Sequence, residues 1–174
     1  HIGNRAFCDC SNLTKVVIGD SVKTIGMNAF ANDAALTDLT IGNSVEEIRD
    51  DAFYGLGITR LVLPASIKTI DGTSLLGLLK LENIEMQDNG SYKSIDGVLY
   101  GNQGKMLIFY PPKRTGEYTI PEGVEKIASS AFTYTGLTRL VISDSVKEIE
   151  EDAIDHSENL KFLTFGKGAK KIPD

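Results

Sequence analysis

Apolar residues recur along the chain with a period of 22 or 23 residues. The motif Ile-Gly-x-x-Ala-Phe begins at Ile2 and returns at Ile25, which is 25 − 2 = 23 residues later. Related versions of the motif begin at Ile48, Ile70, Ile127 and Ile149, the copy at Ile70 being the most degenerate. A fixed period of this length indicates a repeat architecture in which each repeat forms one coil and stacks on the next.

A second apolar pattern, Leu-x-x-Val/Leu-x-Ile, lies inside each repeat. Its first copy consists of Leu13, Val16 and Ile18, and further copies begin at Leu36, Ile58, Leu81, Leu137 and Leu160. The alternation at the end of the pattern predicts a short strand whose side chains face the core and the solvent in turn. Because the register is the same in every repeat, we expect the strands to pair in parallel. This motif at this period is typical of leucine-rich repeats.

The pattern therefore predicts a β-rich α/β fold: a right-handed leucine-rich-repeat solenoid with about seven short parallel strands in one ladder. The expected strands lie near residues 16–18, 39–41, 61–63, 84–86, 118–120, 140–142 and 163–165. The Ala-Phe segments are expected to form short helical turns or irregular segments on the convex side. The predicted core residues are Phe30, Leu36, Ile41, Phe53, Leu61, Phe132, Leu140 and Ile142.

One stretch departs from the repeat. Residues 95–100 and 105–110 read as two strands around the turn sequence Gly-Asn-Gln-Gly, which predicts a hairpin insertion near 95–112. We expect this hairpin to protrude and to enclose its own small core of aromatic residues, with one or two tyrosines exposed as contact points: Tyr92, Tyr100, Phe109, Tyr110 and Tyr118. The chain then forms a single domain, 1–174, with repeats at 2–24, 25–47, 48–69, 70–94, 95–126, 127–148 and 149–171.

The composition argues against several classes of function. The net charge of the 174-residue chain is −6, and sequence-independent binding of nucleic acid needs a basic surface. No apolar run reaches the roughly 18–20 residues of a membrane-spanning helix, so we expect no membrane insertion by this segment. Two cysteines and two histidines leave little for a zinc site or a nucleophile–base pair. We therefore expect no enzymatic activity, no metal and no cofactor.

The repeats resemble a known bacterial family. The run Ile-Gly-x-x-Ala-Phe-x-x-Cys-x-x-Leu-x-x-Val-x-Ile-x-x-Ser-Val-Lys, from Ile2 to Lys23, is similar to the BspA-like, or treponemal-type, leucine-rich repeats. The segment from Asp96 to Pro112 is similar to a variant found within such arrays. The resemblance implies a secreted or cell-surface protein without catalytic residues, some of whose relatives bind host proteins such as fibronectin. It also implies a buried structural role for Cys10, with Cys8 at the surface.

The solvent-facing side chains of the strands are the predicted binding surface, because solenoids commonly bind partners along one extended face. The selected residues are Lys15, Asp38, Thr40, Arg60, Glu82, Glu85, Arg139 and Lys161. The expected function is adhesion or protein interaction, with a host or extracellular-matrix protein as the ligand. The alternative is a carbohydrate-binding module of a glycan-handling surface protein.

Neither end of the sequence reads as a polar cap. The terminal repeats are as apolar as the middle ones, so we expect the sequence to be an internal segment of a longer array. Exposed terminal strands would also make edge-to-edge self-association possible.

Overall fold

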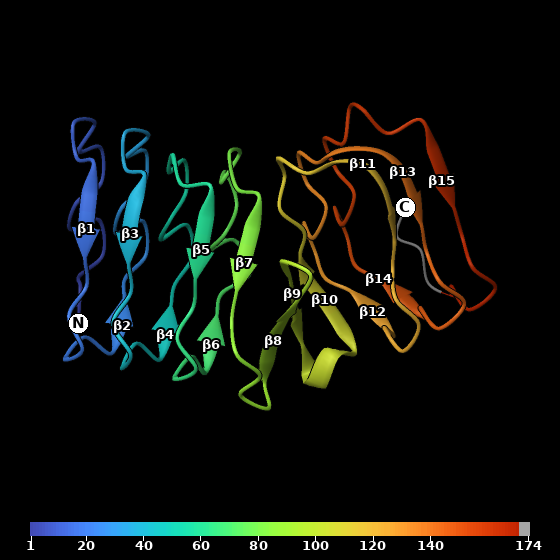
Figure 1. Cartoon of the computed structure of the whole chain (residues 1–174), viewed down its shortest axis with the longest axis horizontal. Coiled ribbons are helices and arrows are strands. Elements are labelled where there is room, and N and C mark those ends of the chain that lie inside the picture. Colours follow the sequence, from blue (N-terminus) through green and yellow to red (C-terminus); the bar gives the residue numbers. More distant parts are fainter. Residues whose placement is uncertain (171–174) are drawn as a thin grey trace.

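The computed structural model describes residues 1–170, and these form a solenoid of stacked coils (Figure 1). Seven parallel strands, here named the first ladder, lie where the repeat pattern predicted them. They are β1 (Lys15–Val17), β3 (Asp38–Thr40), β5 (Arg60–Val62), β7 (Asn83–Glu85), β11 (Thr115–Thr119), β13 (Gly136–Val141) and β15 (Phe162–Thr164). The ladder is not continuous as predicted, because its strands pair in three groups: β1-β3, β5-β7 and β11-β13-β15. The first break falls at the repeat that begins at Ile48, which is one residue shorter than the repeat before it.

A second ladder of parallel strands runs along the solenoid and was not predicted. It contains the two-residue strands β2 (Thr24–Ile25), β4 (Glu47–Ile48), β6 (Thr69–Ile70), β12 (Lys126–Ile127) and β14 (Glu148–Ile149). Each of these strands ends on the isoleucine that begins an Ala-Phe motif. Two residues are too few to show an alternating pattern, so the sequence marks their position but not their strand conformation.

Turns, and not helices, form the convex side of the coils. The only helix in residues 1–170 is the 3-10 helix η1 (Asn102–Gly104), which lies in the hairpin loop. The Ala-Phe segments have left-handed residues at two recurring positions: Arg5, Asn28, Asp51, Ser130 and Asp152 before the alanine, and Asp9, Asn32, Gly55, Gly77, Tyr134 and His156 after the phenylalanine. Backbone N–H groups of these turns donate to carbonyls of the next coil, as Phe7 N–H does to Ala29 and Phe30 N–H to Ala52. Of the two expected forms, helical turns or irregular segments, the structure shows irregular turns, and these add a third set of inter-coil hydrogen bonds.

The predicted hairpin is present, but it is built into the solenoid. Strands β9 (Val98–Gly101) and β10 (Met106–Phe109) pair in antiparallel fashion, and β8 (Tyr92–Ile95) adds an unpredicted third strand. On its other edge β10 pairs in parallel with β12, so the hairpin joins the second ladder. The turn between β8 and β9 is Asp96-Gly97, a sequence that favours tight hairpin turns.

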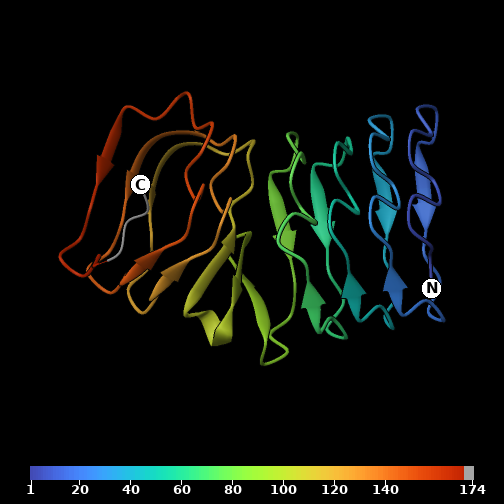
Figure 2. The same cartoon turned by 180° about the vertical axis from the view of Figure 1, so that it is seen from behind.

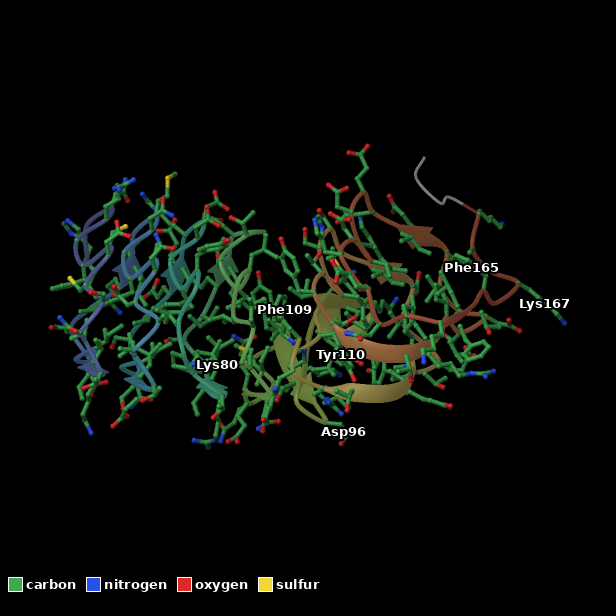
Figure 3. All side chains as sticks on the ribbon, turned by 90° about the horizontal axis from the view of Figure 1, so that it is seen from above. Lys80, Asp96, Phe109, Tyr110, Phe165 and Lys167 are labelled. Carbon is green, nitrogen blue, oxygen red and sulfur yellow. The ribbon has the colours of Figure 1, made fainter. Side chains whose placement is uncertain are left out.

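The hairpin divides the core into two clusters. Leu99 and Phe109 pack in the first cluster, with the residues of the coils before the hairpin. Val98, Tyr100 and Leu107 pack in the second, with the residues of the coils after it. Neighbouring residues of β9 thus face opposite halves. In β10 a register shift lies between Leu107 and Phe109, and these two residues likewise face opposite halves. Figure 3 shows Phe109 in the middle of the molecule, between the two halves that Figure 2 presents from behind.

Aromatic rings stack inside the solenoid along the phenylalanine position of the repeat. Phe30 lies between Phe7 and Phe53, with centroid distances of 5.2 and 6.4 Å. In the second half Tyr110 takes the same position, since its N–H donates to Ala131 and its ring lies 5.3 Å from that of Phe132. The predicted core is confirmed: all eight residues named above are buried.

Candidate functional site

The predicted binding residues gather on one surface, here named the open face: the outward side chains of the first ladder and of the residues just before its strands. Six of the eight are exposed, while Glu85 and Arg139 are half-buried. In the three-residue strands β1, β3 and β5 the central residue, such as Leu61 in β5, is more buried than its two exposed neighbours. The strands therefore present these residues in columns that run along the solenoid axis.

Charges on the open face are paired between adjacent coils. Lys15 Nζ lies 2.7 Å from Asp38 Oδ2. Arg60 donates from Nε and Nη2 to the two carboxylate oxygens of Glu85, at 2.5 Å each, and this contact lowers the pKa of Glu85. In the first half these two pairs place opposite charges side by side on the face. In the second half Arg139 and Lys161 add two positive charges on neighbouring coils.

Apolar side chains lie between the charges on the open face. Val17 and Val62 are both exposed, and they occupy the same outward position in β1 and β5. In the second half the guanidinium of Arg139 lies over the ring of exposed Phe162, 5.7 Å from its centroid. The open face therefore combines charged side chains with scattered exposed apolar ones.

The Asp96-Gly97 turn fills the place where the first ladder is broken between β7 and β11. Ile84 N–H donates to the Gly97 carbonyl at 3.0 Å, and Arg114 Nη1 donates to the Asp96 carbonyl at 2.5 Å. Gly97 has φ +76° and lies against the Asn83 side chain, so a larger residue would collide there. The turn thus links the open face of the first half to that of the second.

The aromatic residues near the hairpin are buried or half-buried. Tyr100, Phe109 and Tyr110 are buried, and Tyr92 and Tyr118 are half-buried. The hydroxyls of Tyr100 and Tyr118 are hydrogen-bonded at 2.6 Å, and burial raises the pKa of both groups. The expected separate hairpin core was wrong, because the two faces of the hairpin pack against the two main cores. Of the five aromatic residues, only Tyr92 and Tyr118 remain partly accessible.

The cysteines and His156 show no catalytic arrangement. The Cys8 thiol donates to Asp9 at 3.1 Å, and this hydrogen bond raises the pKa of the thiol, which disfavours the reactive thiolate. Cys10 is exposed and Cys8 half-buried, the reverse of what the resemblance implied, because Cys10 lies in the first coil and no described residue covers its outer side. His156 Nδ1 contacts Asp155 at 2.6 Å at an exposed turn.

Residues 1–170 contain neither a cluster of metal-ligating side chains nor a membrane-spanning helix. No group of three or more histidine, cysteine or acidic side chains in this range is arranged to hold a metal ion. The same range contains no helix with the length and apolar character needed to cross a bilayer.

Parallel ladders, recurring inward leucine, isoleucine or valine residues and a repeat of 22 or 23 residues in most coils define a leucine-rich-repeat solenoid. Solved structures agree. A leucine-rich cell-surface protein from Faecalibacterium prausnitzii A2-165 is 29% identical over 99% of this chain, with a TM-score of 0.88. The pneumococcal vaccine antigen PcpA is 28% identical over 96% of the chain, with a TM-score of 0.87. A leucine-rich repeat protein from Eubacterium ventriosum is 26% identical over 98%, with a TM-score of 0.75.

The chain belongs to the family of BspA-type leucine-rich repeat regions, whose sequence profile matches residues 1–106 and 105–174. It spans 46% of the F. prausnitzii protein, 42% of PcpA and 58% of the E. ventriosum protein. The curated proteins contain no match to it. None of these matches indicates a catalytic family.

Proposed function

We propose that this chain is a non-enzymatic protein-interaction module of a bacterial cell-surface protein, and that it binds an extracellular-matrix or other host protein through the open face. The observation that carries the proposal is the alternation of paired charges and exposed valines along the first ladder. Its cell-surface setting rests on the F. prausnitzii relative, which is described as a cell-surface protein.

The valines suit this role because they are exposed apolar side chains. A partner can bury them without breaking a hydrogen bond or an ion pair. Burying exposed apolar surface supplies most of the favourable free energy of protein association. The surrounding ion pairs are exposed, so each adds little to affinity and more to the choice and orientation of the partner.

The proposal can be tested by surface plasmon resonance with fibronectin, laminin and collagen immobilised separately. The double variant Val17→Asp/Val62→Asp should lose binding, because it places charge at two exposed apolar positions of the face. The matched control is Met27→Asp/Leu79→Asp. Its two side chains are exposed to 44% and 54%, compared with 65% and 43% for the valines, and they lie outside the open face.

Binding that is retained by the control and lost by the valine variant supports the proposal. If neither variant affects binding, the open face is not the contact surface. If the unmodified chain binds none of the three proteins, the extracellular-matrix assignment is wrong.

A further inference from the structure

A polar hollow of about 270 Å³ lies on the convex side of the first three coils. It is separate from the open face and from the hairpin. Its lining residues are Arg5, Cys8, Asn28, Ala31, Asn32, Asp51 and Tyr54.

The repeat explains why a hollow forms here. Cys8, Ala31 and Tyr54 each follow the stacked phenylalanine of their coil, so they lie in one column. Ala31 is buried and is the smallest of the three, which leaves space between Cys8 and Tyr54. A small side chain between two larger ones in a regular stack therefore forms the floor of the hollow.

A column of polar residues flanks this floor. Arg5, Asn28 and Asp51 have φ of 57°, 53° and 52° and occupy the same turn position in successive coils. Their backbones are held by inter-coil hydrogen bonds, such as Arg5 N–H to Met27 at 2.8 Å and Asn28 N–H to Asp50 at 3.0 Å. Within residues 1–170 none of the three side chains makes a hydrogen bond or an ion pair, so their polar atoms are available to a ligand.

The chemistry of these three side chains favours a neutral ligand with many hydroxyl groups. The Arg5 guanidinium offers donors, the Asp51 carboxylate offers acceptors and the Asn28 amide offers both. The two charges are opposite in sign, so the column does not select an anion or a cation. A ligand that can donate and accept at closely spaced positions satisfies all three.

Tyr54 adds an aromatic surface at the edge of the hollow. The ring is 43% exposed and packs against the backbone of Gly77 in the fourth coil, where an added Cβ would lie 2.7 Å from ring atom Cδ2. This contact holds the ring without covering it. A rigid ring of this kind can pack against the apolar C–H face of a sugar while its hydroxyl remains in water.

We propose that this hollow binds a neutral carbohydrate, with Tyr54 packed against a sugar ring and Arg5, Asn28 and Asp51 hydrogen-bonded to its hydroxyls. The site does not depend on the proposed protein interaction, because it lies on a different side of the solenoid and shares no residue with the open face. Failure of one proposal leaves the other standing.

The test uses the 174-residue chain on an array of neutral oligosaccharides that includes β-glucans, mannans, galactans and N-acetyllactosamine chains. The strongest binder is then titrated by calorimetry. Tyr54→Ala should weaken binding at least tenfold, and Asp51→Asn should weaken it severalfold, since asparagine tolerates the left-handed backbone but has lost the charged acceptor. Tyr134→Ala is the matched control, because Tyr134 is an exposed tyrosine (44%) on the convex side of the second half. This variant should bind the oligosaccharide with unchanged affinity.

The proposal is overturned if no oligosaccharide binds, if Tyr54→Ala and Asp51→Asn leave the affinity unchanged, or if the Tyr134 control weakens it equally. Melting curves establish that each variant is folded. Should Tyr54→Ala unfold, sugar-induced NMR shifts of the Asn28 and Asn32 side-chain amides in the unmodified chain decide the question. Shifts at these amides support the site, and shifts confined to other residues contradict it.

Discussion

Two halves of the molecule, residues 1–86 and the residues after 87, are built from the same repeat. They differ in the residues that fill the left-handed turn position of each coil. In the first half each coil follows the repeat closely, and the left-handed position after the phenylalanine is filled by Asp9, Asn32, Gly55 and Gly77. In the second half the same position holds His156 and Tyr134, and tyrosine tolerates this backbone less well than glycine, asparagine or aspartate. The comparison indicates that inter-coil stacking imposes the turn conformation even where the local sequence disfavours it.

The hairpin explains how two such halves form one solenoid. Leu99 faces the first core and Val98 faces the second, so β9 acts as a shared partition with an apolar residue on each side. The Asp96-Gly97 turn at its end joins the two parts of the open face through Ile84. An insertion that the sequence presents as an interruption is therefore the element that connects the halves.

Core truncation in each half tests this connection with the largest expected effect. Phe53→Ala and Phe132→Ala each remove a fully buried ring and should each lower the free energy of unfolding by about 3–5 kcal/mol. Because the hairpin couples the cores, each variant should still melt in one transition in calorimetry. Two separate transitions, with only one of them shifted, would show that the halves unfold independently.

A buried carboxylate distinguishes the first half and should be the next largest effect. Asp33 is fully buried in the repeat position that Cys10 occupies in the first coil. Burial raises the pKa of its carboxyl, and the nearby Cys10 backbone offsets only part of this rise. Asp33→Cys should stabilise the chain by about 1–3 kcal/mol at pH 7, because it removes a desolvated charge.

The pH dependence of this gain follows from the raised pKa. Below about pH 3.8, the ordinary value, Asp33 is protonated in both the folded and the unfolded chain, so the gain should disappear there. Chemical denaturation of both proteins at pH 7 and pH 3.5 measures the difference. A gain of equal size at both pH values would mean that packing, and not the charge, is responsible.

A substitution at the left-handed turn position of the second half should give a smaller gain in stability. Tyr134 has φ 61°, whereas Gly55 and Gly77 hold the equivalent place in the first half. Tyr134→Gly should therefore raise stability by about 1 kcal/mol, less whatever its 5.0 Å contact with the His156 ring contributes. The converse change, Gly55→Tyr, should destabilise the first half, and a neutral result for both would argue against backbone strain at this position.

The smallest expected effect on stability comes from two glutamates that each lie between two lysines of neighbouring coils, one in each half. Glu46 lies between Lys23 and Lys68, at 2.9 and 2.6 Å, and contacts with Lys68 and then Lys23 lower the pKa of its carboxyl to about 2. Glu125 is held in the same way by Lys105 and Lys147, and its pKa is also lowered.

Glu46→Gln and Glu125→Gln should each lower the melting temperature slightly at pH 7. A carboxyl with a lowered pKa stabilises the fold above its unfolded value of 4.5 and loses that contribution as the pH falls towards 2. The Glu46→Gln difference should therefore be largely lost by about pH 2, the Glu125→Gln difference should also shrink as the pH falls, and both should shrink in 1 M salt. A difference that persists under both conditions would assign the effect to something other than charge.

The sequence predicts the repeats, the seven strands of the first ladder, the hairpin and the core, because periodicity records which side chains are buried in every coil. It does not predict the second ladder, since strands such as Thr24–Ile25 are too short to show a pattern. The prediction that the hairpin aromatics form their own core was wrong, because packing against residues distant in the sequence leaves no pattern in the hairpin sequence itself. The hollow beside Tyr54 depends on Ala31 lying between larger residues of neighbouring coils, a signal that appears only when the repeats are aligned column by column.

The central claim, that β9 is a partition between two cores, can be tested most directly by methyl NOE measurements on Val98 and Leu99 in the folded chain. The account predicts that Leu99 methyls show NOEs to residues of the first core, which includes Leu81 and Ile84, and that Val98 methyls show NOEs to the second, which includes Ile120. NOEs from both residues to the same core would contradict it.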